Sequence, residues 1–173
     1  MNLAAVIRNV PDFPKPGIQF KDITTLVKDP AALRYVVDTW KERYKNKGLT
    51  AIVAADARGF VFGAALAYAM DLPLILARKK GKLPADTISE SFALEYGTDT
   101  VEIHKDALKS GDRALLVDDL LATGGTMAAI ASLVRRLGAE IVEAAFVVEL
   151  PPLKGREKLV GVKVHSLVEF MVE

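Results

Sequence analysis

Short apolar segments alternate with longer segments of helical spacing along most of this chain. The apolar runs at residues 50–55, 74–77 and 114–117 are typical of strands buried on both faces of a parallel sheet, and a further strand is expected over 140–149. The helical spacing lies between them, over residues 30–45, 59–70 and 127–137. Strands that alternate with helices predict an α/β fold, with a central, mostly parallel sheet flanked by helices.

The ends of the chain and one internal segment follow this pattern less closely. Residues 2–9 are expected to form a short helix that ends at a proline-rich stretch, and residues 18–25 have no clear period. A short helix is expected near 153–159 and an edge strand over 163–168. The polar, threonine-rich segment 83–104 predicts either a β-ribbon or a mobile flap over the sheet.

The chain is expected to be one domain, residues 1–173, with the flap at about 79–104, because it contains no repeat and no low-complexity linker. Lysine plus arginine number 23 against 22 for aspartate plus glutamate, so no bulk charge attracts nucleic acid or a membrane surface. There is no cysteine, which excludes disulfides, thiolate metal sites and a cysteine nucleophile. The N-terminus is too soon interrupted for a signal peptide, and the longest apolar run, 60–70, is short for a membrane span. We therefore expect a cytoplasmic protein with no nucleic-acid or membrane partner.

The densest group of chemically useful residues follows the apolar run 114–117. Two carboxylates, Asp118 and Asp119, come at the expected carboxyl end of that strand, and the loop Ala-Thr-Gly-Gly-Thr at 122–126 precedes a helix. Backbone N–H groups, hydroxyls and the positive end of the helix suit a phosphate group. The carboxylates suit ribose hydroxyls or a divalent cation instead. This order predicts a sugar-phosphate site.

Two familiar nucleotide-binding loops are absent from the sequence. The only Gly-Lys pair, Gly81-Lys82, is followed by Leu83, so there is no phosphate-binding loop of the G-x-x-x-x-G-K-[ST] type, and no G-x-G-x-x-G occurs. A Thr-Gly-Gly-Thr loop alone would also fit an ordinary strand–turn–helix connection. The apolar strand, the acidic pair and the helix around it make the pattern more specific.

Basic residues follow two other predicted strands. Arg58 comes after the strand 50–55, and a basic run at 78–82 comes after the strand 74–77. Ligands of parallel sheets sit beyond the carboxyl ends of the strands, so these cations are expected near Asp118. A basic run alone is equally typical of a solvated turn. Beside a phosphate loop, anion binding is favoured.

Several segments, taken in order, resemble the adenine phosphoribosyltransferases, a branch of the type I phosphoribosyltransferases. They are residues 13–24, 57–60, 78–84, 94–97, 102–107 and 113–127. The resemblance implies the type I phosphoribosyltransferase fold, with a flexible flap and a small N-terminal hood that binds the base. It also implies the purine-salvage reaction of adenine with phosphoribosyl pyrophosphate (PRPP), which gives AMP and pyrophosphate. Mg²⁺ would be bound mainly through PRPP, pyrophosphate and water, with no protein metal ligand, and the protein would be a homodimer.

The resemblance also assigns the two ends of PRPP. The ribose 5-phosphate part would be bound by Asp118, Asp119, Ala122, Thr123, Gly124, Gly125 and Thr126. The pyrophosphate part would be bound by Asp56, Ala57, Arg58, Arg78, Lys79, Lys82 and Tyr96. In this family the loop before the arginine that corresponds to Arg58 commonly holds a non-proline cis peptide bond, which here would be Asp56–Ala57.

Adenine is expected in the hood. By resemblance, the carbonyl of Gln19 would accept from N6, the N–H of Lys21 would donate to N1, and the ring would lie between Phe20 and Leu120. Phe20 as plain core is the alternative. Glu95 would accept or stabilise the N9 proton, and Arg58 would stabilise the leaving pyrophosphate.

Two further positions carry side chains that bear on the site. Phe92 replaces the tyrosine that the family carries before the 94–97 segment, so a hydroxyl is missing there. His104 is expected to be structural, because nothing with catalytic spacing surrounds it.

Two other functions stay open at this point. Transfer to a 6-oxo purine such as hypoxanthine or xanthine needs the opposite hydrogen-bonding pattern, typically from a lysine side chain. Some transcriptional regulators share the fold and sense PRPP, but they carry a DNA-binding appendage or a basic face. The near-neutral charge of this chain disfavours that role.

Overall fold

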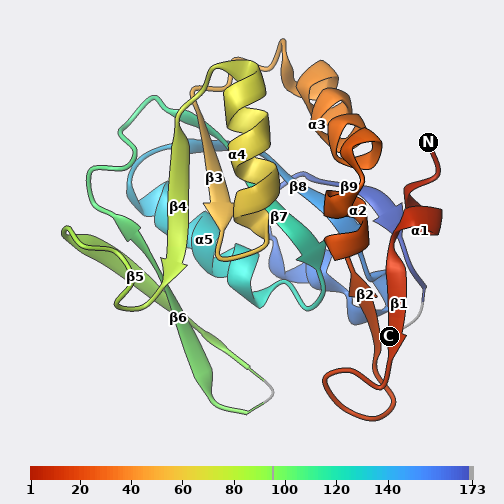
Figure 1. Ribbon diagram of the computed structural model, residues 1–173. Coiled ribbons are helices and arrows are strands. Elements are labelled where there is room, and N and C mark those ends of the chain that lie inside the picture. The colour runs from red at the N-terminus through yellow and green to blue at the C-terminus, as the bar shows by residue number, and fades with distance from the viewer. Residues whose placement is uncertain (95, 172–173) are drawn as a thin grey trace.

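A computed structural model describes residues 1–94 and 96–171, and this part of the chain forms a seven-stranded sheet and a separate two-stranded hairpin (Figure 1). In spatial order, the strands of the sheet are β5 Thr87–Ala93, β6 Thr98–His104, β4 Leu74–Lys79, β3 Ala51–Ala55, β7 Arg113–Leu121, β8 Glu140–Glu149 and β9 Val164–Glu169. Neighbours from β4 to β9 pair in parallel, whereas β5 and β6 form an antiparallel ribbon on β4. The predicted α/β fold with a mostly parallel sheet is confirmed.

Helices cover both faces of the sheet. The helices α3 Pro30–Tyr44 and α4 Gly59–Met70 lie on one face, and α5 Gly125–Arg136 lies on the other (Figure 1). The sequence of strand β3 is apolar throughout because both of its faces are buried. Val53 packs in the core under α5, and Ile52 packs in the core under α3 and α4. At the start of α3, Asp29 accepts a hydrogen bond of 3.0 Å from the N–H of Ala31, as its capping position predicts.

The N-terminal region differs from the prediction. Within the expected helix 2–9, only Leu3–Val6 is helical (α1), and residues 8 and 9 instead begin the strand β1 Arg8–Pro11. It pairs with β2 Gln19–Asp22, and a short helix α2 Thr24–Lys28 follows. A helix this short is marginal without packing, so the pairing with β2 outweighs local preference. The residues of β2 are half-buried on both faces, so the sequence carries no alternating signal there.

Two further elements extend beyond their predicted bounds or change type. Strand β7 continues through Asp118 and Asp119, which therefore lie inside the strand, because β8 keeps pairing with it as far as Glu149. The expected helix at 153–159 is two short 3₁₀ turns, η1 Pro151–Leu153 and η2 Gly155–Lys158. Of the two alternatives for 83–104, the described residues form the β-ribbon.

The β1–β2 hairpin and the β5–β6 ribbon lie on either side of the carboxyl ends of the central strands (Figure 1). Strands β3, β4 and β7 point towards the bottom of Figure 1, where the β1–β2 hairpin and the β5–β6 ribbon both extend beyond the sheet. No helix within residues 1–94 and 96–171 is long and apolar enough to cross a lipid bilayer.

Candidate active site

The loop between β7 and α5 turns its backbone towards one small volume. Gly124 has a φ of 87°, a left-handed conformation that favours glycine, and its carbonyl accepts from Ala128 as α5 begins. The first N–H groups of a helix have no acceptor inside it, so those that follow Gly124 are available to a ligand. The loop borders a cavity of about 530 Å³, here called the loop cavity, which includes Ala122, Thr123, Gly124, Gly125 and Thr126 among its lining residues.

Asp118, the first residue of the acidic pair, lines this cavity, and Asp119 follows it. The Asp119 N–H donates to Oδ1 of Asp118 at 2.7 Å, and Asp119 is 4% exposed. A Cβ on Gly59 would lie 2.9 Å from the same Asp118 oxygen, so helix α4 approaches the pair closely at its first residue. Burial and then the charge of Asp119 raise the pKa of the Asp118 carboxyl well above its usual range.

Arg58 connects the acidic pair to a second cavity. Its Nε donates to Oδ2 of Asp119 at 2.5 Å. The second cavity, of about 590 Å³, is here called the basic cavity, and its lining includes Arg58, Arg78, Lys79 and Lys82. Both cavities share Asp118, Leu120 and Thr126 in their lining. Two volumes that suit anions therefore meet at Asp118, and its neighbour Asp119 borders the basic cavity.

The cations of the basic cavity are held by carboxylates and by the turn that carries them. Arg78 Nε lies 3.1 Å from Asp56 Oδ2, and Lys79 Nζ lies 3.9 Å from Asp99 Oδ2. The predicted cis peptide bond between Asp56 and Ala57 is present.

The turn 79–82 is fixed by Glu102. This side chain accepts from the N–H of Gly81 at 2.7 Å and from the hydroxyl of Thr87 at 2.9 Å. These bonds, the Gly81 N–H first, lower the pKa of Glu102 and keep it ionised beside the lysines.

The hairpin β1–β2 presents Phe20 to the site. Its ring centroid lies 5.8 Å from the Arg58 guanidinium carbon. The side chains of Gln19 and Lys21 are both hydrogen-bonded to Asn9, at 2.7 and 2.8 Å. Alternate residues of a strand point to opposite sides, so Phe20 faces the site while its two neighbours face away.

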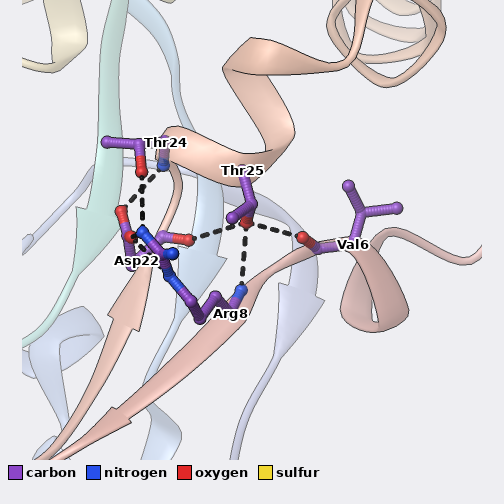
Figure 2. A network of polar contacts seen from close by, with 5 residues as sticks. All are labelled: Val6, Arg8, Asp22, Thr24 and Thr25. Atoms are coloured by element: carbon purple, nitrogen blue, oxygen red, sulfur yellow. Dashed lines mark hydrogen bonds and ion pairs between the residues drawn. The ribbon is translucent and has the colours of Figure 1, made fainter.

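A polar network holds the hairpin to α2 (Figure 2). Arg8 forms an ion pair with Asp22, and Asp22 also accepts from the N–H of Thr24. The hydroxyl of Thr25 donates to the carbonyl of Val6 at 2.7 Å. The Arg8 hydrogen bond, together with those from Thr24, lowers the pKa of Asp22 to about 2.

The ribbon contacts the loop through Phe92. Its ring lies 3.1 Å from where a Cβ on Gly125 would be, and it lines both cavities. At this position the family carries a tyrosine, and here the Phe92 ring, without the hydroxyl, packs against the loop at Gly125. His104 accepts from the Ala85 N–H at 3.2 Å within the flap and lines neither cavity, which fits the expected structural role.

Not every predicted site residue is brought to the cavities. Tyr96 is 78% exposed, with Lys15 Nζ 5.3 Å from its ring centroid, and it lines neither cavity. The structure therefore does not place it with the other predicted pyrophosphate residues, because the ribbon tip lies beside the proline-rich loop. Glu95 lies outside the described residues. Sequence reasoning missed Asp99 and Lys158, which line the basic and the loop cavity and belong to no local motif.

Known proteins resemble the chain throughout its length. The Phosphoribosyl transferase domain family matches residues 22–168. An adenine phosphoribosyltransferase of Syntrophotalea carbinolica is 56% identical over 169 residues, which cover 98% of this chain and 99% of the relative. One of Marinobacter nauticus is 52% identical, with coverage of 98% and 95%. The chain belongs to the adenine phosphoribosyltransferase family.

Solved structures agree with this membership. An adenine phosphoribosyltransferase from Thermoanaerobacter pseudethanolicus has a TM-score of 0.93 and 48% identity, covering 96% of this chain and 97% of that one. The enzyme of Trypanosoma brucei, solved with AMP, pyrophosphate and ribose-5-phosphate, has a TM-score of 0.88 and 30% identity, covering 95% and 77%. The type I phosphoribosyltransferase fold predicted from the sequence is thereby confirmed.

Proposed function

We propose that the chain transfers the 5-phosphoribosyl group of PRPP to N9 of adenine, giving AMP and pyrophosphate. The observation that carries this proposal is the meeting of two anion-suited cavities at Asp118 and Leu120. PRPP has a phosphate at one end and a pyrophosphate at the other, with a ribose between them. The family to which the chain belongs carries out this reaction by name.

The ribose 5-phosphate part would occupy the loop cavity. Backbone N–H groups of 122–126 and the N-terminal end of α5 suit a phosphate monoester. Asp118 and Asp119 would accept hydrogen bonds from the 2′- and 3′-hydroxyls. Asp119 first has to leave Arg58, which holds it in the free protein.

The pyrophosphate part would occupy the basic cavity. Asp56, Ala57 and Arg58 border it from one strand end, and Arg78, Lys79 and Lys82 border it from the next. Arg58, once free of Asp119, can stabilise the charge that develops on the leaving group. For Tyr96 the proposed contact requires the ribbon tip to move from its position beside Lys15.

Adenine would bind at the hairpin edge. Strand β2 pairs only with β1 among the described residues, so its outer edge keeps backbone groups available. We assign the Gln19 carbonyl to N6 and the Lys21 N–H to N1. Phe20 and Leu120 would cover the two faces of the ring. A backbone contact at Lys21 agrees with a side chain that is engaged by Asn9.

Glu95 is proposed to accept the proton that N9 loses, a role that rests on family membership and on its place in the 94–97 segment. A positioned general base typically contributes about 10²- to 10⁴-fold to the rate. The turnover number of Glu95→Gln should therefore decrease by about 10²- to 10⁴-fold, while the affinity for PRPP changes little. Equal turnover in the variant and the wild type would exclude the role.

Magnesium is proposed to enter with PRPP. Mg²⁺ keeps several waters and usually binds through one or two carboxylates plus substrate phosphates. Asp118 borders both cavities and Asp119 borders the basic cavity, so the donor set fits an ion held mainly by PRPP oxygens and water. Bound there, it would neutralise charge on the pyrophosphate.

Two finer properties complete the proposal. Helix α4 exposes Val61 and Tyr68, the latter 92% exposed, and the neighbouring β4 exposes Leu76. An apolar face of this kind suits a second copy of the chain, and sedimentation equilibrium measures the expected homodimer directly.

The cellular location is proposed from the composition, because a chain without cysteine agrees with a cytoplasmic protein.

The deciding experiment supplies PRPP and Mg²⁺ with adenine, hypoxanthine, guanine or xanthine in parallel. AMP formed from adenine, with no product from the other bases, is the expected result. Turnover with only a 6-oxo purine would keep the PRPP site and overturn the assignments at Gln19 and Lys21. Tight PRPP binding without turnover of any base would indicate a PRPP-sensing regulator instead.

A further inference from the structure

The 3₁₀ turn η2 lies directly against the loop that borders the loop cavity. A Cβ on Gly124 would lie 2.4 Å from the carbonyl oxygen of Gly155. In the other direction, a Cβ on Gly155 would lie 2.5 Å from the carbonyl oxygen of Ala122 and 2.8 Å from Cδ1 of Leu121. Two backbones therefore meet without side chains between them, and the position of η2 is set by the loop itself.

The rest of η2 is anchored to the sheet and the core. Arg156 donates to both carboxylate oxygens of Glu149 on β8, each at 2.7 Å, and also to the carbonyl of Val164 on β9 at 3.2 Å. Leu159, directly after the turn, is buried in the core beneath α5. These contacts commit the cation of Arg156 to the sheet, so it is not available to a ligand in the loop cavity.

Lys158 is the remaining cation of the turn, and it lines the loop cavity together with Thr123, Gly124 and Gly125. Among the described residues of that lining, Lys158 is the only basic one and Asp118 the only acidic one. Within the described part of the chain, Lys158 forms no ion pair with a carboxylate. The acidic residue that shares a shallow surface pocket with it, Glu90, is already paired with Arg136 at 3.1 Å.

The loop alone offers a phosphate only neutral donors. Backbone N–H groups, threonine hydroxyls and a helix end contribute partial charges, whereas a phosphate monoester carries nearly two negative charges near neutral pH. Asp118 adds a carboxyl at the border of the same cavity. The ammonium group of Lys158, in the lining of this cavity, supplies the full positive charge that the loop itself lacks, and charge-assisted hydrogen bonds are the stronger kind.

We propose that Lys158 binds the phosphate monoester of the substrate in the loop cavity, and that the Gly155 backbone contact positions it there. The inference deepens the proposed function and rests on it for the identity of the ligand. Lys158 would thus be a specificity residue for the 5′-phosphate end of PRPP, separate in sequence from the loop that it serves.

The test measures the two ends of the substrate separately, by calorimetry with ribose 5-phosphate and with pyrophosphate as probes. Lys158→Gln is expected to weaken ribose 5-phosphate binding about tenfold, the effect of one hydrogen bond to a charged group, and to leave pyrophosphate binding unchanged. Lys158→Arg keeps the charge and should restore most of the affinity. The KM for PRPP should rise about tenfold in Lys158→Gln, with the KM for adenine unchanged.

Lys41→Gln is the matched control, because Lys41 is an exposed lysine on α3 that lines neither cavity. Equal ribose 5-phosphate affinity in Lys158→Gln and wild type would overturn the inference. Equal weakening of both probes would overturn it too, since it would indicate a general loss of charge or structure. No binding of ribose 5-phosphate to the wild type would reject the phosphate site and Lys158 with it. Normal binding of ribose 5-phosphate without AMP formation would instead count against the proposed function alone.

Discussion

The loop cavity is shaped mainly by backbone contacts, whereas the basic cavity is shaped mainly by charged side chains. Beside the loop cavity, backbone meets backbone, with Gly124 against Gly155, and the geometry leaves no room for a Cβ. Beside the basic cavity, long side chains supply the surface, and their partners are carboxylates. The side chain of Arg58 is 51% exposed although the Asp119 that it holds is 5% exposed.

The difference separates a preformed site from one that has to rearrange. Close-packed backbone has few alternative arrangements, so the loop should have the same shape with and without phosphate. Arg58 and Arg78 would instead have to exchange one partner for another on binding pyrophosphate, because each is paired with an aspartate in this structure. Under the proposed function, pyrophosphate binding in the basic cavity would therefore replace existing ion pairs.

The largest loss of activity should come from a substitution that disturbs the loop cavity, the preformed site. Gly124→Ala forces an alanine into a φ of 87° and places its Cβ 2.4 Å from the Gly155 oxygen. We expect kcat/KM for PRPP to fall more than about a hundredfold, because small displacements of a positioning group cost that much. Left-handed strain and the clash together should lower stability by about 2–4 kcal/mol, measured by urea unfolding.

Gly111→Ala is the control for that experiment. Gly111 has a φ of 95°, and among the described residues nothing lies within 4 Å of the position of its Cβ. It should lose about 1–2 kcal/mol from strain alone and keep its kinetics. If both variants lose activity equally, the contact with Gly155 is not what shapes the loop.

A smaller loss of ligand affinity is expected from a substitution in the basic cavity, where the side chains have to rearrange. Arg78→Gln removes a cation that lines the basic cavity and leaves Asp56 without its partner. Pyrophosphate binding, measured by calorimetry, should weaken roughly 10- to 30-fold, the effect of losing a charge-assisted hydrogen bond. Ribose 5-phosphate affinity should stay within about twofold, because the loop does not depend on this side chain.

Arg34→Gln on α3 serves as its control, since Arg34 is exposed and lines neither cavity. A fall in ribose 5-phosphate affinity as large as the fall for pyrophosphate would contradict the comparison. It would mean that the two cavities respond as one unit.

The same difference explains what the sequence could predict. The strand, the acidic pair and the loop 122–126 are consecutive, so local pattern and spacing were sufficient to identify them. The contacts that shape the loop come from Phe92 and Gly155, which are distant in sequence, and a lone glycine or phenylalanine carries no sign of its partner. Asp99 and Lys158 were missed for the same reason.

Local pattern also failed where pairing decides the structure. Residues 8 and 9 were expected to end the first helix, yet they belong to β1 because β2 lies beside them. Asp118 and Asp119 were expected after their strand, but β8 extends the pairing past them. Partners distant in sequence set both outcomes, and hydrophobic periodicity does not report such partners.

The smallest effect concerns the hairpin, which is attached through side chains like the basic cavity. Arg8→Gln removes the partner that, with Thr24, lowers the pKa of Asp22 to about 2 (Figure 2). A carboxyl with a lowered folded pKa contributes stability above its unfolded pKa, about 3.9, and loses it as the pH falls through the folded value. Because the Arg8 side chain is 58% exposed, the loss should be only about 0.5–1 kcal/mol at neutral pH.

The pH dependence separates this ion pair from simple packing. Urea unfolding of Arg8→Gln and wild type should show a constant difference above about pH 5 that narrows between about pH 4 and pH 2. The KM for adenine should rise about twofold to fivefold at neutral pH, because the hairpin that carries Phe20 is held less firmly. Lys45→Gln, which breaks the exposed pair with Glu42 on α3, should change neither quantity measurably. A stability difference that stays constant down to the lowest pH would assign the role of Arg8 to the packing of its side chain, and the hairpin would then belong with the preformed side of the molecule.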